Sequence, residues 1–417
     1  MRRRRHGARA TAVLPALVLT LALLLAPAAS AAPAAGPPRI EAKAWIVVDG
    51  GSGDVLASHA AQRHLPIAST TKLMTAFVAM HELPLDKIVR AAPYEPIYGE
   101  SLLGLKTGEK VSVRDLLYGL ILVSGNDAAH TLAVRAAGSQ ARFVAQMNRH
   151  AAALGLADTH YANPVGLDQR GNYSSAADLT TLARRLLAMP AFAKIADSRT
   201  ALLRSLRPPR RIDTLNELLN VAPWATGVKT GHTFDAGYVL VGSGRRDGVE
   251  LVSAAIGAPT EETRTSDNLE LLEWGFAQYR QRFPVRRGQD LAEPDIRWSG
   301  GQLPLRAERS LQVGVRRGQQ LDLRVQAPQE VQGPIQRGAK LGQAVVFVDG
   351  RRVGAVALLA SRSVSEASLF DRARATVADN SIPIGIAAFV ILIFALAMAR
   401  RLTRRHDSGS RSRVKAE

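Results

Sequence analysis

The order of strand-like and helix-like segments limits the fold of this 417-residue chain more than any other feature. Strand patterns occur at 45–49 and 54–57, on either side of a glycine turn, and return at 227–230, 237–241 and 249–257. Between these two groups the apolar side chains have helical spacing at 69–82, 113–122, 141–154 and 176–187, and an amphipathic helix follows at 268–279. Strands at both ends of a helical stretch predict one sheet, built from distant parts of the chain and carrying a helical insertion.

The character of the sequence changes after Phe283, where short strand patterns are broken by glycine and proline. These patterns lie at 311–315, 321–325, 341–348 and 353–360. They predict a small all-β domain. The predicted fold class is therefore α+β, with a linker at 32–43, a first domain at 44–282, a β-rich domain at 283–374 and a second linker at 375–381.

The N-terminus has the three parts of a secretory signal peptide at 1–31. Arginines precede an apolar stretch that begins near Ala10, and the small residues Ala29-Ser30-Ala31 follow it. An uncleaved membrane anchor is the alternative, because alanine-rich stretches obscure a cleavage site. Both interpretations place the bulk of the chain outside the cytoplasm.

An apolar segment without any charged residue, 382–399, lies near the other end of the chain. As a helix it would extend about 27 Å at about 1.5 Å per residue, which is just enough to cross a bilayer. Arginines follow at once in the basic tail 400–417, which should therefore stay in the cytoplasm by the positive-inside rule. A buried core helix is the alternative. We predict an exported protein on the outer face of the cell membrane, held by one C-terminal transmembrane helix.

Most of the positive charge belongs to these two ends. The formal net charge is +18, and the leader and the tail contribute +5 each, which leaves +8 for all other residues. The excess therefore reflects export and topology, and no nucleic-acid partner is predicted. The chain has no cysteine, so disulfides, thiolate metal sites and a cysteine nucleophile are excluded.

Three short motifs follow one another in a defined order. Ser69-Thr-Thr-Lys72 stands at a predicted helix start, Ser124-Gly-Asn126 follows an apolar helix, and Lys229-Thr-Gly-His232 lies on a predicted strand. The order SxxK, SxN, KTG is that of serine β-lactamases and penicillin-binding proteins.

Each motif also has a second copy elsewhere in the chain. Lys106-Thr-Gly108 precedes Ser124, Ser266-Asp-Asn268 follows Lys229, and Ser412-x-x-Lys415 lies in the tail. Only one choice of copies gives the required order together with helix, loop and strand contexts.

The side chains of the chosen motifs are suited to acyl transfer. On a helix Ser69 and Lys72 lie one turn apart on one face, so the amine can reach the hydroxyl. Ser69 is the predicted nucleophile, and Lys72 is its general base, with a pKa lowered by desolvation and a second cation. Ser124 is placed to pass a proton to the leaving amine. The N–H groups of Ser69 and His232 are predicted to stabilise the oxyanion.

The remaining motif residues are suited to a peptide that ends in a carboxylate. Asn126 can donate to a substrate amide carbonyl, and Lys229 with Thr230 offers a cation and a hydroxyl to the carboxylate. Gly231 allows the substrate backbone to approach the strand edge, as in strand addition. His232 is expected to contribute its backbone rather than to titrate.

In these motifs the sequence resembles the low-molecular-mass penicillin-binding proteins that are serine D-alanyl-D-alanine carboxypeptidases, peptidase family S11. The resemblance extends from about Ala44 to Tyr279, and the β-rich segment to about Ser363 is similar to the second domain of the family. It includes Asn163-Pro-Val-Gly-Leu-Asp168, Tyr173-Ser-Ser-Ala-Ala-Asp178 and Trp274-Gly-Phe276.

The resemblance implies a β-lactamase/transpeptidase-like fold, in which an antiparallel sheet is flanked by helices. It also implies an acyl-enzyme reaction that removes the terminal D-alanine from peptidoglycan stem pentapeptides ending in D-Ala-D-Ala. The implied inhibitors are β-lactams, and no cofactor is implied. Arg264 matches a family arginine that helps to hold the terminal carboxylate. Several relatives have an amphipathic C-terminal helix that lies on the membrane, whereas 382–399 has no polar face.

Other functions remain as alternatives on the same scaffold. A β-lactamase needs an efficient deacylating base, and Glu217 with Asn220 lies in the expected region but with a different spacing from the lactamase pattern. A D,D-endopeptidase would use the same site. A non-enzymatic cell-wall binder would require a broken motif, and none is broken. A zinc peptidase is excluded because Leu85 stands where a second metal-binding histidine would follow His81.

Overall fold

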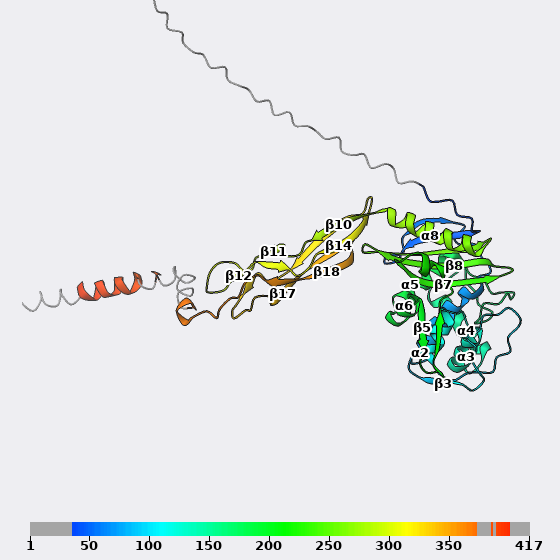
Figure 1. Cartoon of the computed structure of the whole chain (residues 1–417). Helices are drawn as coiled ribbons and strands as arrows, with labels where there is room; N and C mark the ends of the chain where they lie inside the picture. Colours follow the sequence, from blue (N-terminus) through cyan, green and yellow to red (C-terminus); the bar gives the residue numbers. More distant parts are fainter. Residues whose placement is uncertain (1–35, 373–384, 387–388, 401–417) are drawn as a thin grey trace, which may run out of the picture. The chain divides into compact units, whose positions relative to one another are not determined.

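The computed structural model describes residues 36–372, 385–386 and 389–400 (Figure 1). By internal contacts the chain divides into Met1–Gly36 and Pro37–Glu417, and every element described below belongs to the second unit. The predicted signal peptide at 1–31 and linker at 375–381 lie outside the described residues, as does the tail apart from residue 400.

The central sheet joins strands from both ends of the first 260 residues. Its order is β2-β1-β9-β8-β7, and all neighbours are antiparallel. The strands are β1 (Ala44–Asp49), β2 (Val55–His59), β7 (Ala225–Thr233), β8 (Gly237–Arg246) and β9 (Val249–Ala258). β1 pairs with β9 through partners such as Trp45 and Ala255. The prediction of one sheet from distant segments is confirmed.

Helices cover both faces of this sheet (Figure 1). The insertion between β2 and β7 contains the short helix η1 (Ala68–Thr71), six α-helices before β5 and one after β6, and two small hairpins. The helices are α1 (Lys72–Glu82), α2 (Val113–Ile121), α3 (Asn126–Ala137), α4 (Gln140–Ala153), α5 (Ala176–Leu187), α6 (Pro190–Ala196) and α7 (Glu217–Val221). The hairpins pair β3 (Ile88–Arg90) with β4 (Lys110–Ser112) and β5 (Thr200–Leu203) with β6 (Arg210–Asp213).

The alternation of side chains along β1 divides the interior into two cores. Ile46 and Val48 face the core formed with α1 to α6, whereas Trp45 and Val47 face the core formed with α8 (Glu261–Ala277). Successive side chains of a strand point to opposite faces, so a strand that is apolar at every position must be covered on both sides.

Three sequence-based boundaries differ from the structure. The segment predicted as one helix from residue 69 begins with the 3-10 turn η1. α8 begins at Glu261 instead of 268 because the Thr260 side chain accepts the N–H of Thr263 and caps the helix, so Arg264 lies inside it. β8 runs from Gly237 to Arg246, beyond the strand pattern at 237–241, and the turn after it is Asp247-Gly248, both with positive φ.

The residues after α8 form a β-rich region with a core of its own. A five-stranded sheet has the order β11-β13-β18-β17-β15, and two strand pairs join β10 to β14 and β12 to β16. The strands are β10 (Tyr279–Val285), β11 (Asp290–Ala292), β12 (Asp295–Ile296), β13 (Leu305–Ala307), β14 (Leu311–Arg316), β15 (Leu321–Gln326), β16 (Glu330–Val331), β17 (Lys340–Val348) and β18 (Arg351–Ala360). The predicted β-rich domain is confirmed.

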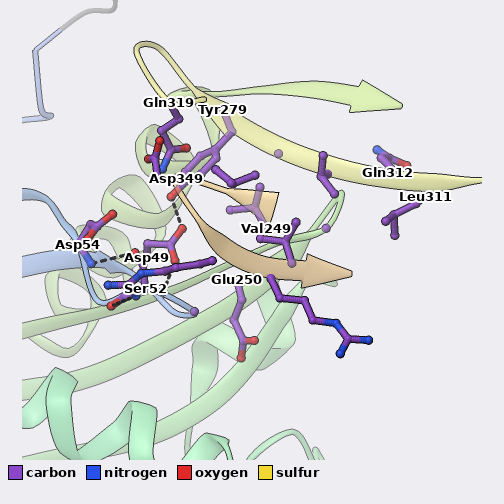
Figure 2. Close-up of a pocket in the computed structure, with 18 residues that line it drawn as sticks. Asp49, Ser52, Asp54, Val249, Glu250, Tyr279, Leu311, Gln312, Gln319 and Asp349 are labelled. Atoms are coloured by element: carbon purple, nitrogen blue, oxygen red, sulfur yellow. Dashed lines mark hydrogen bonds between the residues drawn. The ribbon is translucent and has the colours of Figure 1, made fainter. Parts of the chain in front are cut away.

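The β-rich region contacts the turn between β1 and β2. Tyr279 donates its hydroxyl to Asp49 at 2.5 Å, Arg316 pairs with Asp54 at 2.6 Å, and Arg351 donates to the carbonyl of Ser52 at 2.9 Å. A cavity of about 520 Å³ lies beside these contacts (Figure 2).

The predicted transmembrane segment 382–399 is only partly described. Residues 385–386 and 389–399 are helical, and within the described ranges the structure contains no helix with the length and hydropathy needed to span a bilayer.

Candidate active site

Ser69 and Lys72 lie where η1 passes into α1. Lys72 Nζ lies 2.9 Å from Ser69 Oγ and donates to the carbonyl oxygen of Val165 at 2.5 Å. Lys72 is fully buried, whereas Ser69 is partly exposed. The amine is thereby held against the hydroxyl and shielded from water.

Burial controls the charge of this amine. It lowers the pKa of Lys72 to about 7, and the carboxylates of Glu100 and Asp127 oppose this shift. A lysine with a pKa near neutrality is present in substantial amount as the free base, which is the form that can accept a proton from a hydroxyl.

The loop that supplies the Val165 carbonyl is part of the resembling segment 163–168. The Asn163 side chain accepts the N–H groups of Val165 and Gly166, and Thr75 donates to the carbonyl of Pro164 at 2.6 Å. Gly166 has a φ of 87°, and a Cβ there would lie 2.1 Å from the carbonyl oxygen of Ala68. Only glycine therefore allows this loop to pack against η1 and present its carbonyl to Lys72.

Ser124 and Asn126 lie between α2 and α3. Ser124 is buried with a φ of 58°, and its Oγ has no hydrogen-bond partner among the described residues. Asn126 is the first residue of α3, is also buried, and donates from Nδ2 to Glu100 Oε2 at 2.8 Å. A strained backbone and a buried, unpaired hydroxyl are typical of a functional position.

The third motif lies on the edge strand β7. Lys229 and Thr230 are buried, and Lys229 Nζ donates to the Thr230 carbonyl at 2.8 Å. Burial lowers the pKa of Lys229 well below its usual value, and the positive charges of Lys72 and Arg264 add to this effect. His232 is exposed, and its ring stacks on Tyr238 with centroids 4.1 Å apart.

Position 231 must be a glycine for a structural reason that the sequence did not reveal. A Cβ at this position would lie 2.8 Å from the backbone nitrogen of Ser69 and 3.0 Å from Ala68 Cβ. Glycine therefore allows β7 to approach η1 itself, whereas the sequence interpretation concerned the approach of substrate.

Arg264 extends from α8 and is buried beside Tyr238. Its Nη2 pairs with Glu261 at 2.6 Å, and its guanidinium carbon lies 5.8 Å from the Tyr238 ring centre. Its Nε is buried without a partner among the described residues. Because its charge affects Lys229, Arg264 belongs to the same cationic group as the KTG lysine.

The structure thus brings residues from η1, α1, α3, β7 and α8 toward one place, and comparisons with known proteins show the family of the chain. The family described as D-alanyl-D-alanine carboxypeptidase, peptidase S11, matches residues 31–260. The C-terminal domain of penicillin-binding protein 5 matches residues 279–366. The chain belongs to the S11 family.

Individual relatives agree with this assignment. The D-alanyl-D-alanine carboxypeptidase DacC of Escherichia coli K12 is 33% identical over 353 residues, which is 80% of this chain and 87% of the relative. DacB2 of Mycobacterium tuberculosis is 40% identical over 57% of this chain and 82% of its own length. The crystal structure of penicillin-binding protein 5 from Haemophilus influenzae has a TM-score of 0.56 at 28% identity, and covers 80% of this chain and 100% of that chain.

This S11 enzyme therefore has a transpeptidase-like α+β domain followed by a β-rich C-terminal domain. Glu217, the candidate for a lactamase-type base, is exposed on α7, and Asn220 donates to it at 3.4 Å. In the described part of the chain no group of three or more histidine, aspartate or glutamate side chains is arranged to hold a metal ion.

Sequence reasoning missed three residues that organise the site. Asp127 accepts the N–H groups of Leu103, Gly104 and Leu105, each at 2.8 Å, and so fixes a loop over the start of α3. Glu100 accepts from Asn126 and from the hydroxyl of Tyr94. Asp127 directly follows the second motif, but neither Glu100 nor Tyr94 has a spacing that would reveal its role.

Proposed function

We propose that the chain is a serine D-alanyl-D-alanine carboxypeptidase that removes the terminal D-alanine from peptidoglycan stem pentapeptides and is acylated by penicillins. The observation that carries this proposal is the 2.9 Å contact between Ser69 Oγ and the fully buried amine of Lys72. Membership of the S11 family supports the same reaction.

The acylation step uses the lowered pKa of Lys72. Neutral Lys72 takes the proton of Ser69 Oγ while that oxygen attacks the carbonyl carbon of the penultimate D-alanine. The N–H groups of Ser69 and His232 donate to the oxygen as it becomes negative. The bond to the terminal D-alanine then breaks, and the leaving amine takes a proton that Lys72 passes through Ser124. Ser124 Oγ is suited to this transfer because no protein group in the described structure engages it.

Substrate binding requires a partner for the terminal carboxylate. Lys229, Thr230 and Arg264 provide cations and a hydroxyl for it. The lowered pKa of Lys229 belongs to the site without substrate, and an incoming carboxylate opposes that shift by favouring the charged amine. Asn126 donates to the amide carbonyl of the peptide. Water then hydrolyses the ester on Ser69 and releases the shortened peptide.

The location of the enzyme is part of the proposal. A signal peptide at 1–31 exports the chain, the helix 382–399 spans the membrane, and the tail 400–417 stays inside. The absence of charge in 382–399 and the arginines that follow support this topology. We also propose the domain limits 44–282 and 283–374, with β10 crossing the boundary between them.

The nucleophile is tested by labelling with a fluorescent penicillin and by measuring D-alanine release from a D-Ala-D-Ala pentapeptide. Ser69→Ala should abolish both signals, because it removes the oxygen that lies against the Lys72 amine. Ser266→Ala, an exposed serine of the second SxN copy, is the matched control and should behave like the unaltered protein. Labelling that survives in Ser69→Ala would show that Ser69 is not the nucleophile. Rapid turnover of penicillin by the unaltered protein would favour a β-lactamase.

The anchor is tested by ending the chain at residue 381. We expect the shortened protein to leave the membrane fraction and to retain its acylation rate, because the residues of the candidate site all lie between Ser69 and Arg264. The full chain in the same cells is the control. If the shortened protein stays with the membrane, 382–399 is not the anchor.

A further inference from the structure

Glu100 is an acidic residue of the site to which the proposed reaction gives no role. It lies in the loop between β3 and β4, and this loop also contains Tyr94. One of its oxygens, Oε2, accepts from Asn126 Nδ2 at 2.8 Å and from the Tyr94 hydroxyl. The other, Oε1, accepts the N–H of Ile97 at 3.3 Å. Glu100 is partly buried, and Asn126 is buried.

The chemistry of these contacts decides the orientation of the Asn126 amide. An ionised carboxylate can only accept hydrogen bonds, so it must meet the NH₂ group of Asn126 and not the carbonyl oxygen. The Tyr94 hydroxyl serves as a donor because burial and the neighbouring Glu100 charge raise the pKa of Tyr94. With one N–H of Asn126 bound to Glu100, the second N–H of the same group is left to donate to a substrate carbonyl.

We propose that Glu100 is a positioning residue that fixes the side-chain amide of Asn126 with its NH₂ group ready for the substrate carbonyl. The inference deepens the proposed function, on which it rests, because it concerns substrate binding at the same site. Glu100 is not a catalytic residue in this proposal, since it acts on substrate only through Asn126.

The same carboxylate has an electrostatic effect that a merely structural residue would lack. The charged groups that act on Lys72 are Glu100 and Asp127, and both raise its pKa. The Lys72 charge in turn lowers the pKa of Lys229. Removing the charge of Glu100 therefore lowers the pKa of Lys72 further below about 7. More of the amine is then free base at acidic pH.

Two variants separate orientation from charge. Glu100→Gln keeps the size of the side chain but can accept or donate, so it allows either orientation of the Asn126 amide. Glu100→Asp keeps the charge but is one methylene shorter and withdraws the carboxylate from Asn126. Glu95→Gln is the matched control, because Glu95 is an exposed acid in the same loop.

The experiment measures the second-order rate constant of acylation by penicillin from pH 5 to 9 in the full-length protein, together with the KM for a D-Ala-D-Ala pentapeptide. We expect about a tenfold loss of acylation rate at pH 9 in Glu100→Gln and in Glu100→Asp, because a charge-assisted hydrogen bond is lost. KM should rise more than kcat falls. The acidic midpoint should move to lower pH in Glu100→Gln only, and Glu95→Gln should match the unaltered protein.

Each contrary outcome has a definite meaning. If both Glu100 variants acylate like Glu95→Gln over the whole pH range, the positioning role is wrong. If they lose rate equally at every pH, with kcat lowered and KM unchanged, Glu100 only supports the loop and the proposal fails. An unaltered protein that neither reacts with penicillin nor releases D-alanine would overturn the proposed function itself, which is a separate result.

Discussion

At the scale of single residues, the site depends on amines that the protein holds out of water. Lys72 and Lys229 are both buried, and burial lowers the pKa of each. Desolvation of a cation normally destabilises a fold, so two such groups side by side indicate a constraint from chemistry rather than from stability. The benefit is a lysine base that is free at neutral pH, adjacent to a hydroxyl.

The pH dependence of acylation follows from this pKa. Below about pH 7 Lys72 is protonated and cannot take the proton of Ser69, so the acylation rate should fall toward acid with a midpoint near 7. Above that pH the amine is neutral and the rate should level off. Stopped-flow measurement of penicillin acylation from pH 5 to 9 tests this expectation. A rate that is constant down to pH 5 would exclude Lys72 as the titrating base.

At the scale of elements, the loop 163–168 and strand β7 hold η1 between them through glycine contacts. Gly166 approaches the carbonyl of Ala68, and Gly231 approaches the nitrogen of Ser69. Ala68 itself has a positive φ of 47°, so the backbone before the nucleophile is strained. The position of Ser69 therefore depends on packing by two elements that are distant in sequence.

Gly166→Ala tests this packing against a closely matched control. Gly166 and Gly171 share a φ of 87°, but a Cβ at Gly171 meets nothing closer than the His160 ring at 3.6 Å. In Gly171→Ala the free energy of unfolding should fall only by the cost of a left-handed backbone, about 1–2 kcal/mol. Gly166→Ala also pushes the loop away from Ala68. Its free energy of unfolding should therefore fall by about 3 kcal/mol or more, and most of the acylation rate should be lost.

Thermal unfolding and penicillin labelling of both variants provide the measurement. The two variants should differ clearly in each assay. Equal stability together with equal labelling would mean that the loop relaxes without moving η1.

The sequence predicted elements well where apolar periodicity is strong. α5 was predicted with its observed ends, but α3 was missed because its buried face is mainly alanine, as at Ala128, Ala129 and Ala133. The predicted strand 237–241 ends before Gly242 and Gly244, whereas the structure places both glycines inside β8. There Ser253 and Trp224 occupy the space that a Cβ would need. A glycine at a close contact therefore resembles a glycine at a turn when only the sequence is known.

The candidate site shows the same limit. Ser69 and Lys72 could be paired from helical spacing alone, and the motif order selected Asn126 and Lys229. The contact of Val165 with Lys72 and that of Glu100 with Asn126 join loops to helices, and no periodicity relates such positions. The roles of the motif side chains remain predictions that the variants above test.

At the scale of the whole molecule, the β-rich region has its own core and is joined to the β1–β2 turn by few side chains. The Tyr279 hydroxyl reaches Asp49 and the Arg316 guanidinium reaches Asp54, and Figure 2 shows Tyr279, Asp49 and Asp54 at this junction. Burial and the Asp49 carboxylate raise the pKa of Tyr279, so the hydroxyl remains a donor throughout the ordinary pH range. Separate cores joined by a few polar contacts should unfold independently once those contacts are removed.

The double variant Tyr279→Phe with Arg316→Gln removes two of the three side-chain bonds to the β1–β2 turn and leaves that of Arg351 to the Ser52 carbonyl. We expect the free energy that couples the unfolding of the two regions to fall by about 1–2 kcal/mol, because the partly exposed Arg316 pair contributes less than a buried bond would. Calorimetry should then resolve two transitions, with the penicillin acylation rate unchanged because neither residue contacts η1 or β7. Arg306→Gln, which breaks an exposed ion pair within the β-rich region, is the control and should unfold like the unaltered protein. A single transition at the original temperature in the double variant would show that backbone pairing and apolar packing, and not these two side chains, couple the regions.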